Sequence, residues 1–158
     1  MISPTTIELA TRRATNDLAR RLGPFLKPSD LVILTGPLGA GKTFFTRALC
    51  RALGLPADSR VPSPTFTLVH EHDTDPPLSH ADLYRVSTPA QVRELGLDAQ
   101  RDDGRVLVVE WGEPYIAELG GDALVLTFGL NPRRVTLSAT GRRSSELLAE
   151  FEREGGGG

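Results

Sequence analysis

A glycine-rich run at residues 36–43 has the residue types and spacing of a phosphate-binding loop. The run reads Gly-Pro-Leu-Gly-Ala-Gly-Lys-Thr and fits the pattern G-x-x-x-x-G-K-[ST] at every position. In such a loop the glycines let backbone N–H groups converge on phosphate oxygens, and the following helix adds further donors. Lys42 would neutralise the β- and γ-phosphate oxygens, and the hydroxyl of Thr43 would ligate Mg²⁺. The run therefore predicts a site for a nucleoside triphosphate and its magnesium ion.

Two acids stand where hydrolysis would need a further metal-side group. Glu110 directly follows the apolar run Val106–Val109, and Asp82 follows residues 78–81. Carboxylates at the ends of neighbouring buried strands can hold the metal ion or orient the attacking water. We expect Glu110 to be the metal-side ligand, directly or through water, while Asp82 either assists the reaction or caps a turn. His80 is a candidate hydrogen-bond partner of Asp82.

The elements around the loop are those that a phosphate site requires. Residues 31–34 form a continuous apolar run bounded by turn residues, which is typical of a strand buried on both faces. Residues 42–53 carry Phe45, Leu49 and Leu53 at helical spacing, and Gly54 ends this predicted helix. The loop is thus expected to leave a buried strand and to enter the N-terminus of a helix.

Strands and helices alternate through the rest of the chain, and two strands follow near its end. Strands are predicted at residues 6–10, 65–70, 78–85, 105–110, 124–130 and 135–139, and helices at 12–22, 90–95 and 144–152. Residues 71–77 are predicted to form a polar loop. This order predicts a layered α/β domain with a mixed sheet. We expect a single domain over residues 1–154 and a flexible glycine tail at residues 155–158.

The composition limits the classes of protein to consider. Of 158 residues, 39% are hydrophobic and 24% are charged, which is a globular balance. The formal net charge of −2 argues against a protein that grips a polyanion by bulk charge, so any RNA contact is expected to be local or made through a partner. The single cysteine, Cys50, cannot form an internal disulfide, and no run approaches the roughly 18 apolar residues of a membrane span. With no signal peptide visible either, we expect a cytoplasmic protein.

Four blocks in this order resemble one family, the TsaE (YjeE) family of P-loop ATPases. They are GPLGAGKT at residues 36–43, SPTFTLV at 63–69, HADLYR at 80–85 and VEW at 109–111. The loop alone is unspecific, whereas its combination with the other three blocks is highly specific. The resemblance implies a P-loop NTPase-like three-layer sandwich with a mixed, mainly parallel central sheet. It also implies a Mg²⁺-dependent ATPase.

The resemblance also carries roles onto residues of this sequence. It implies that Thr43 and Glu110 are the Mg²⁺ ligands, that Asp82 is the acid needed for hydrolysis, and that Lys42 acts on the phosphates. The nucleotide-binding loop is implied to comprise Gly39, Ala40, Gly41, Lys42 and Thr43, with Phe44 next on the helix. The family's late basic residue near the nucleotide maps to Arg133 or Arg134, with Arg142 and Arg143 as a poorer alternative. Residues 63–65 lie where the family has a switch-like loop, and Trp111 is either beside the site or a core aromatic.

The function implied by the resemblance is that of an accessory protein. Such a protein hydrolyses ATP to support formation of N6-threonylcarbamoyladenosine (t6A) in tRNAs that read codons starting with A. It acts with the TsaD and TsaB proteins and reaches tRNA through that complex. Two other functions remain open from the sequence: a P-loop kinase for a small molecule, and a nucleotide-gated scaffold that does not need hydrolysis.

Overall fold

The fold is built on one seven-stranded sheet with the strand order β1-β7-β6-β2-β5-β4-β3. A computed structural model describes residues 3–61 and 68–156. The four central strands β6, β2, β5 and β4 are parallel, whereas β1, β7 and β3 join the sheet in antiparallel pairs. The strands are β1 (Thr5–Glu8), β2 (Leu31–Thr35), β3 (Val69–His72), β4 (Leu78–Asp82), β5 (Val106–Glu110), β6 (Leu124–Gly129) and β7 (Arg134–Ala139).

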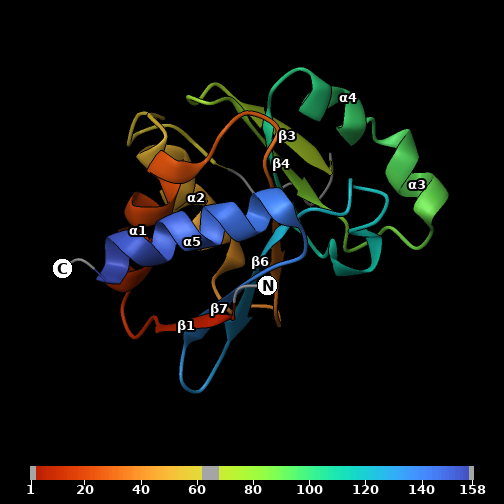
Figure 1. Cartoon of the computed structure of the whole chain (residues 1–158). Helices are drawn as coiled ribbons and strands as arrows, with labels where there is room; N and C mark the ends of the chain where they lie inside the picture. Colours follow the sequence, from red (N-terminus) through yellow and green to blue (C-terminus); the bar gives the residue numbers. More distant parts are fainter. Residues whose placement is uncertain (1–2, 62–67, 157–158) are drawn as a thin grey trace.

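Helices cover both faces of this sheet (Figure 1). One face carries α1 (Arg12–Leu22), α2 (Lys42–Ala52) and α5 (Arg142–Gly156). The other face carries the shorter helices α3 (Pro89–Glu94) and α4 (Leu97–Asp102). The chain also forms two short 3-10 helices, η1 (Gly23–Phe25) and η2 (Glu113–Tyr115). The predicted three-layer α/β sandwich, with a sheet that is parallel at its centre, is therefore confirmed.

Strand β2 lies in the middle of the sheet and is buried on both faces. Val32 and Leu34 belong to the core under α1, α2 and α5, whereas Leu31 and Ile33 belong to the core on the α3 side. All four side chains are at most 2% exposed. A strand held in this way has little freedom, so it fixes the start of the glycine-rich loop that follows it.

Side chains cap the starts of two helices. The Thr11 hydroxyl accepts a 3.1 Å hydrogen bond from the backbone of Ala14 and so caps α1. At α3, Thr88 and Gln91 form a capping box. These caps satisfy backbone N–H groups that a helix cannot satisfy internally.

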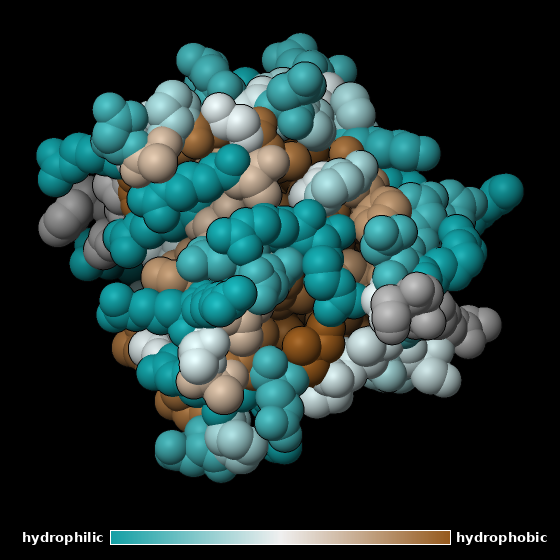
Figure 2. Space-filling model, turned by 90° about the vertical axis from the view of Figure 1, so that its left-hand side faces the viewer, coloured by the Kyte–Doolittle hydropathy of each residue, from teal (hydrophilic) through white to brown (hydrophobic). Residues whose placement is uncertain are grey.

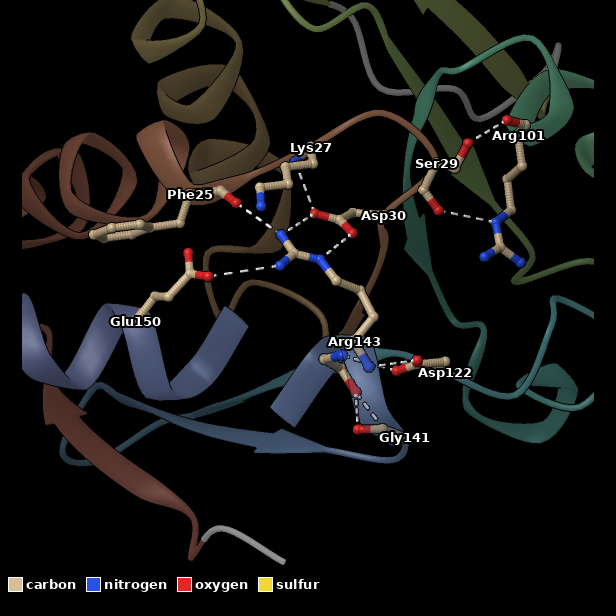
Figure 3. Close-up of polar contacts among 10 residues, drawn as sticks. Phe25, Lys27, Ser29, Asp30, Arg101, Asp122, Gly141, Arg143 and Glu150 are labelled. Atoms are coloured by element: carbon tan, nitrogen blue, oxygen red, sulfur yellow. Dashed lines mark hydrogen bonds and ion pairs between the residues drawn. The ribbon is translucent and has the colours of Figure 1, made fainter. Parts of the chain in front are cut away.

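A cluster of polar contacts fastens α5 to the start of β2 (Figure 3). The Arg143 guanidinium donates to both carboxylate oxygens of Asp30 at 2.9 Å and to the Phe25 carbonyl at 2.9 Å. Asp122 accepts hydrogen bonds from the backbone N–H groups of Arg143 and Ser144, in the first turn of the helix. The Asp30 side chain is only 5% exposed, so its charge depends on the Arg143 pair. This cluster lies at the opposite end of β2 from the glycine-rich loop.

The structure departs from the sequence predictions at several element boundaries. Strands β1 and β4 end at Glu8 and Asp82, short of the predicted ends at residues 10 and 85. Strand β3 extends to His72, into the stretch predicted to be a loop. Helix α4 had no counterpart among the predicted elements. Helix α5 begins at Arg142 and continues to Gly156, inside the stretch expected to be a tail. The two strands predicted near the end of the chain are confirmed, and they form a hairpin because β6 and β7 pair over their whole length.

The surface seen from the left-hand side of Figure 1 is dominated by hydrophilic side chains, with apolar atoms visible between them (Figure 2). Among the described residues no helix is long and apolar enough to span a bilayer.

Candidate nucleotide-binding site

The glycine-rich loop runs from the end of β2 into the first turn of α2. Gly36 has φ +133°, and a Cβ at this position would lie 2.4 Å from the Phe128 carbonyl oxygen of β6. Gly41 has φ +109° and immediately precedes the helix. A residue with a side chain would be strained at either position, so both glycines are required by the shape of the turn.

Lys42 is the first residue of α2 and is only 5% exposed. Its Nζ donates a 2.6 Å hydrogen bond to the Gly36 carbonyl and lies 3.8 Å from the centroid of the Trp111 ring. Burial lowers the pKa of Lys42, and the nearby carboxylates of Glu110, Glu113 and Asp82 oppose that shift. Burying the charged ammonium group in this site therefore costs free energy, which an anionic ligand beside it would offset.

The side chains of Thr43, in the first turn of α2, and Glu110, at the end of β5, point toward each other. The Thr43 Oγ1 lies 3.3 Å and 3.4 Å from the two carboxylate oxygens of Glu110, which is 3% exposed. A hydroxyl and a carboxylate are oxygen ligands of the kind that Mg²⁺ prefers. Among the described residues there is no cluster of three or more His, Cys, Asp or Glu side chains suited to a metal ion. The pair fits an ion that takes its other ligands from phosphates and water.

His80 pairs with Glu110 and not with Asp82, the partner that the sequence suggested. The His80 Nε2 lies 2.6 Å from Glu110 Oε2, and both side chains are buried. In the parallel pairing of β4 and β5, His80 stands opposite Val108 and Asp82 stands opposite Glu110. Alternation along β4 puts the His80 and Asp82 side chains on the same face of the sheet, where His80 reaches diagonally to Glu110.

Asp82 ends β4 and lies at the rim of the same site. Its Oδ1 accepts a 2.9 Å hydrogen bond from the backbone of Tyr84, so the predicted turn cap is present. Burial raises the pKa of Asp82, the Tyr84 hydrogen bond opposes the shift, and the Glu110 charge adds to it. Asp82 lines a cavity of about 430 Å³ together with Lys42, Thr43, Glu110 and Trp111.

A second cavity, of about 330 Å³, lies on the other side of the loop. Its lining includes Gly39, Ala40, Gly41, Phe44, Arg12 and Arg133. The Arg133 guanidinium donates a 3.2 Å hydrogen bond to the Gly39 carbonyl, and that of Arg12 lies 5.8 Å from the centroid of the Phe44 ring. The structure thus places Arg133 against the loop, whereas Arg134 lies in β7 opposite Glu8 and outside the linings of both cavities.

Comparison with known proteins shows to which family the chain belongs. A sequence model of the family described as "Threonylcarbamoyl adenosine biosynthesis protein TsaE" matches residues 9–136. The chain belongs to the TsaE family.

Individual relatives agree with this assignment. A protein from Streptomyces coelicolor named "tRNA threonylcarbamoyladenosine biosynthesis protein TsaE" is 41% identical over 138 residues, covering 80% of this chain and 91% of the relative. A protein of the same name from Bacillus subtilis is 36% identical over 143 residues, covering 88% of each chain. The crystal structure of YdiB from Bacillus subtilis superposes with a TM-score of 0.80 at 30% identity, over 98% of this chain and 97% of that one.

Several residues that line the two cavities were not predicted from the sequence, among them Arg12 and Tyr84, which contact predicted site residues through a guanidinium group and a ring. Arg12 lines the second cavity, whereas the sequence predicts it only as the first residue of a helix. Tyr84 lines the first cavity, and its ring centroid lies 5.0 Å from that of Trp111. No local pattern marks Arg12, because α1 reaches the loop only through packing. The expected switch-like residues 63–65 lie outside the described residues.

Proposed function

We propose that this chain is a Mg²⁺-dependent ATPase that serves t6A formation in tRNA. Membership of the TsaE family supports the role in t6A biosynthesis. The observation that supports ATP hydrolysis is the convergence of Lys42, Thr43, Asp82 and Glu110 on one cavity beside a glycine-rich loop. Cation, hydroxyl and two carboxylates are the groups that phosphoryl transfer to water requires.

The two cavities suggest how ATP is held. Both are lined by Gly39, Gly41 and Phe44, so they meet at the loop. The cavity with Thr43 and Glu110 suits the terminal phosphates and Mg²⁺. The cavity with Phe44, Arg12 and Arg133 suits the base and ribose, because an aromatic ring and guanidinium planes can pack on a base.

Each side chain in this cavity has its own role in the proposed hydrolysis. Lys42 binds the phosphate oxygens once it releases the Gly36 carbonyl. Thr43 and Glu110 hold Mg²⁺, which when bound neutralises the charge that develops on the phosphates. Asp82 orients the attacking water and accepts its proton, and the raised pKa of this carboxyl makes it a better base.

The proposed partners are the TsaD and TsaB proteins, with tRNA reached through them, in the cytoplasm. Leu38 in the loop is 71% exposed and Tyr84 is 60% exposed, and both line the cavity of the catalytic groups. Exposed apolar side chains beside a reaction site suit contact with another protein. The net charge of −2 likewise suits a protein partner better than direct capture of RNA.

A hydrolysis assay tests the proposal and separates it from its rivals. The purified chain, incubated with ATP and Mg²⁺ with and without TsaD and TsaB, is expected to release ADP and inorganic phosphate in equal amounts. Transfer of the phosphoryl group to a small molecule instead would identify a kinase. In a tRNA modification assay we expect the chain to raise multiple turnover over single turnover. Full support of modification by Asp82→Asn without hydrolysis would identify a scaffold.

A further inference from the structure

His80 makes the one short side-chain contact to Glu110 among the described residues. Its Nε2 lies 2.6 Å from Glu110 Oε2, whereas the Thr43 hydroxyl lies at 3.3 Å or more. The His80 side chain is fully buried and that of Glu110 is 5% exposed. A buried carboxylate needs a hydrogen-bond donor, and His80 supplies it.

The ring of His80 does not line the cavity that contains Glu110, Thr43 and Lys42. His80 stands opposite Val108, two residues before Glu110, so it reaches the carboxylate diagonally along one face of the sheet. The side chain therefore contacts Glu110 without facing a ligand in that cavity. Its effect on a bound nucleotide would have to pass through Glu110.

We propose that His80 is a positioning residue whose Nε2–H holds the Glu110 carboxylate toward Thr43. This proposal rests on the proposed function for its consequence, because an oriented carboxylate matters where Mg²⁺ is bound. The proton then resides on Nε2, and Nδ1 is left without a hydrogen-bond partner in residues 3–61 and 68–156. Without the His80 donor, Glu110 would be free to turn toward the Lys42 ammonium, whose charge it already influences.

His72 provides a matched control. It lies on β3, on the same sheet face as His80, because His70 pairs with His80 and His72 pairs with Leu78. It is also buried, at 8% exposure, and its Nε2 makes no hydrogen bond within the described residues. Replacing His72 by Leu therefore changes a similar environment without touching Glu110.

The test measures how Mg²⁺ changes ADP affinity by calorimetry in His80→Leu, His80→Gln and His72→Leu. For His80→Leu we expect the half-saturating Mg²⁺ concentration to rise by roughly tenfold or more, the size typical of lost outer-shell hydrogen bonds. ADP affinity without Mg²⁺ should be unchanged. His80→Gln, which keeps a side-chain N–H donor, should recover most of the loss, and His72→Leu should match the wild type. Equal shifts in His80→Leu and His72→Leu would overturn the proposal.

A double-mutant comparison asks whether His80 acts through Glu110. In a Glu110→Gln background, His80→Leu is expected to add little further loss of Mg²⁺ affinity. A full additional loss would show that His80 acts by another route and would overturn the assignment.

The tautomer of His80 tests the same contact without nucleotide or metal. Nitrogen-15 NMR of the ligand-free protein should show a proton on the Nε2 of His80 that contacts Glu110. A ring whose Nε2 carries no proton would contradict the proposal. Absence of any Mg²⁺ effect on ADP binding by the wild type would instead count against the proposed ATPase, so the two failures are distinguishable.

Discussion

The ammonium group of Lys42 donates a 2.6 Å hydrogen bond to the carbonyl oxygen of Gly36, so the two ends of the glycine-rich loop are tied together. The same group lies 3.8 Å from the centroid of the Trp111 ring. Lys42 is therefore already hydrogen-bonded within the loop. A phosphate that bound there would have to displace the Gly36 carbonyl from the lysine.

Replacing Lys42 by Ala is expected to abolish hydrolysis without unfolding the protein. Loss of a cation that stabilises phosphoryl transfer should lower the rate by at least about 100-fold. Burial lowers the pKa of Lys42, so removal of its charge should offset part of the stability lost with its hydrogen bond to Gly36, and the variant should remain folded. Phosphate release and thermal unfolding measure the two effects. The control is Lys27→Ala, which removes an exposed lysine. A stable variant with normal turnover would contradict the assignment of Lys42.

Replacing Glu110 by Gln is expected to weaken the response to Mg²⁺. The amide keeps the size of the side chain but lacks the charge that a divalent cation requires. We expect turnover to fall by about 100-fold at fixed Mg²⁺, while nucleotide binding without Mg²⁺ persists. Titration of the rate with Mg²⁺ checks this, with the exposed Glu94→Gln as the control. Unaltered Mg²⁺ dependence would remove Glu110 from the metal site.

Replacing Asp82 by Asn is expected to lower turnover and to raise the melting temperature at pH 7. Burial raises the pKa of Asp82, so between the ordinary aspartate pKa, about 3.9, and the raised value the folded chain binds more protons than the unfolded chain. The stability linked to this carboxyl is thus full at acid pH and is lost as pH rises through the folded pKa. We expect the variant to melt higher than the wild type at pH 7, with the difference shrinking on acidification. Turnover should fall by about 100-fold or more. Melting curves across pH test the sign, and a variant that melts lower than the wild type at pH 7 would contradict it.

Arg143→Met is expected to destabilise the fold and leave the chemistry intact. Removal of this guanidinium leaves the Asp30 carboxylate, 5% exposed, without its ion pair (Figure 3). Breaking a buried pair in this way costs about 3 kcal/mol. Denaturant unfolding measures the loss, and the matched control Arg142→Met removes a side chain that is 94% exposed. Turnover per folded molecule should be normal in both, because this cluster lies at the far end of β2 from the loop.

Cys50 is expected to be inert in the folded protein. Burial raises the pKa of its thiol to about 12, so the reactive thiolate is scarce at neutral pH. A thiol reagent at pH 8 should label the chain only as fast as it unfolds. Complete labelling in denaturant provides the control, and rapid labelling of native protein would contradict the buried position.

The strand, loop and helix around Lys42 could be predicted from the sequence because each depends on local residue order. A buried apolar run, glycines at fixed positions and helical spacing all lie between residues 31 and 53. Glu110 could be placed for the same reason, since four apolar residues lead directly to it. Asp82 is likewise a candidate from its place at the end of a predicted strand, and the structure places it in the same cavity as Glu110.

Contacts set by strand register could not be predicted. The partner of His80 depends on β4 pairing with β5 so that His80 reaches diagonally to Glu110, and neither strand's sequence specifies that offset. The choice between Arg133 and Arg134 likewise depends on where the hairpin ends relative to the loop, and only Arg133 reaches Gly39. Helix α4 follows Gly96 without a side-chain cap, whereas the equally short α3 has the Thr88 cap and a proline at its start.

The strand order also governs when the protein can fold during synthesis on the ribosome. Strand β2, which leads into the glycine-rich loop, is flanked by β5 and β6, and β1 pairs with β7 near the end of the chain. A nascent chain that has exposed the first hundred residues therefore carries the loop without either neighbour of its supporting strand. Such long-range pairing slows folding. Nucleotide binding should begin only after β6 has left the exit tunnel, so the nascent chain passes most of its translation unable to take up ATP.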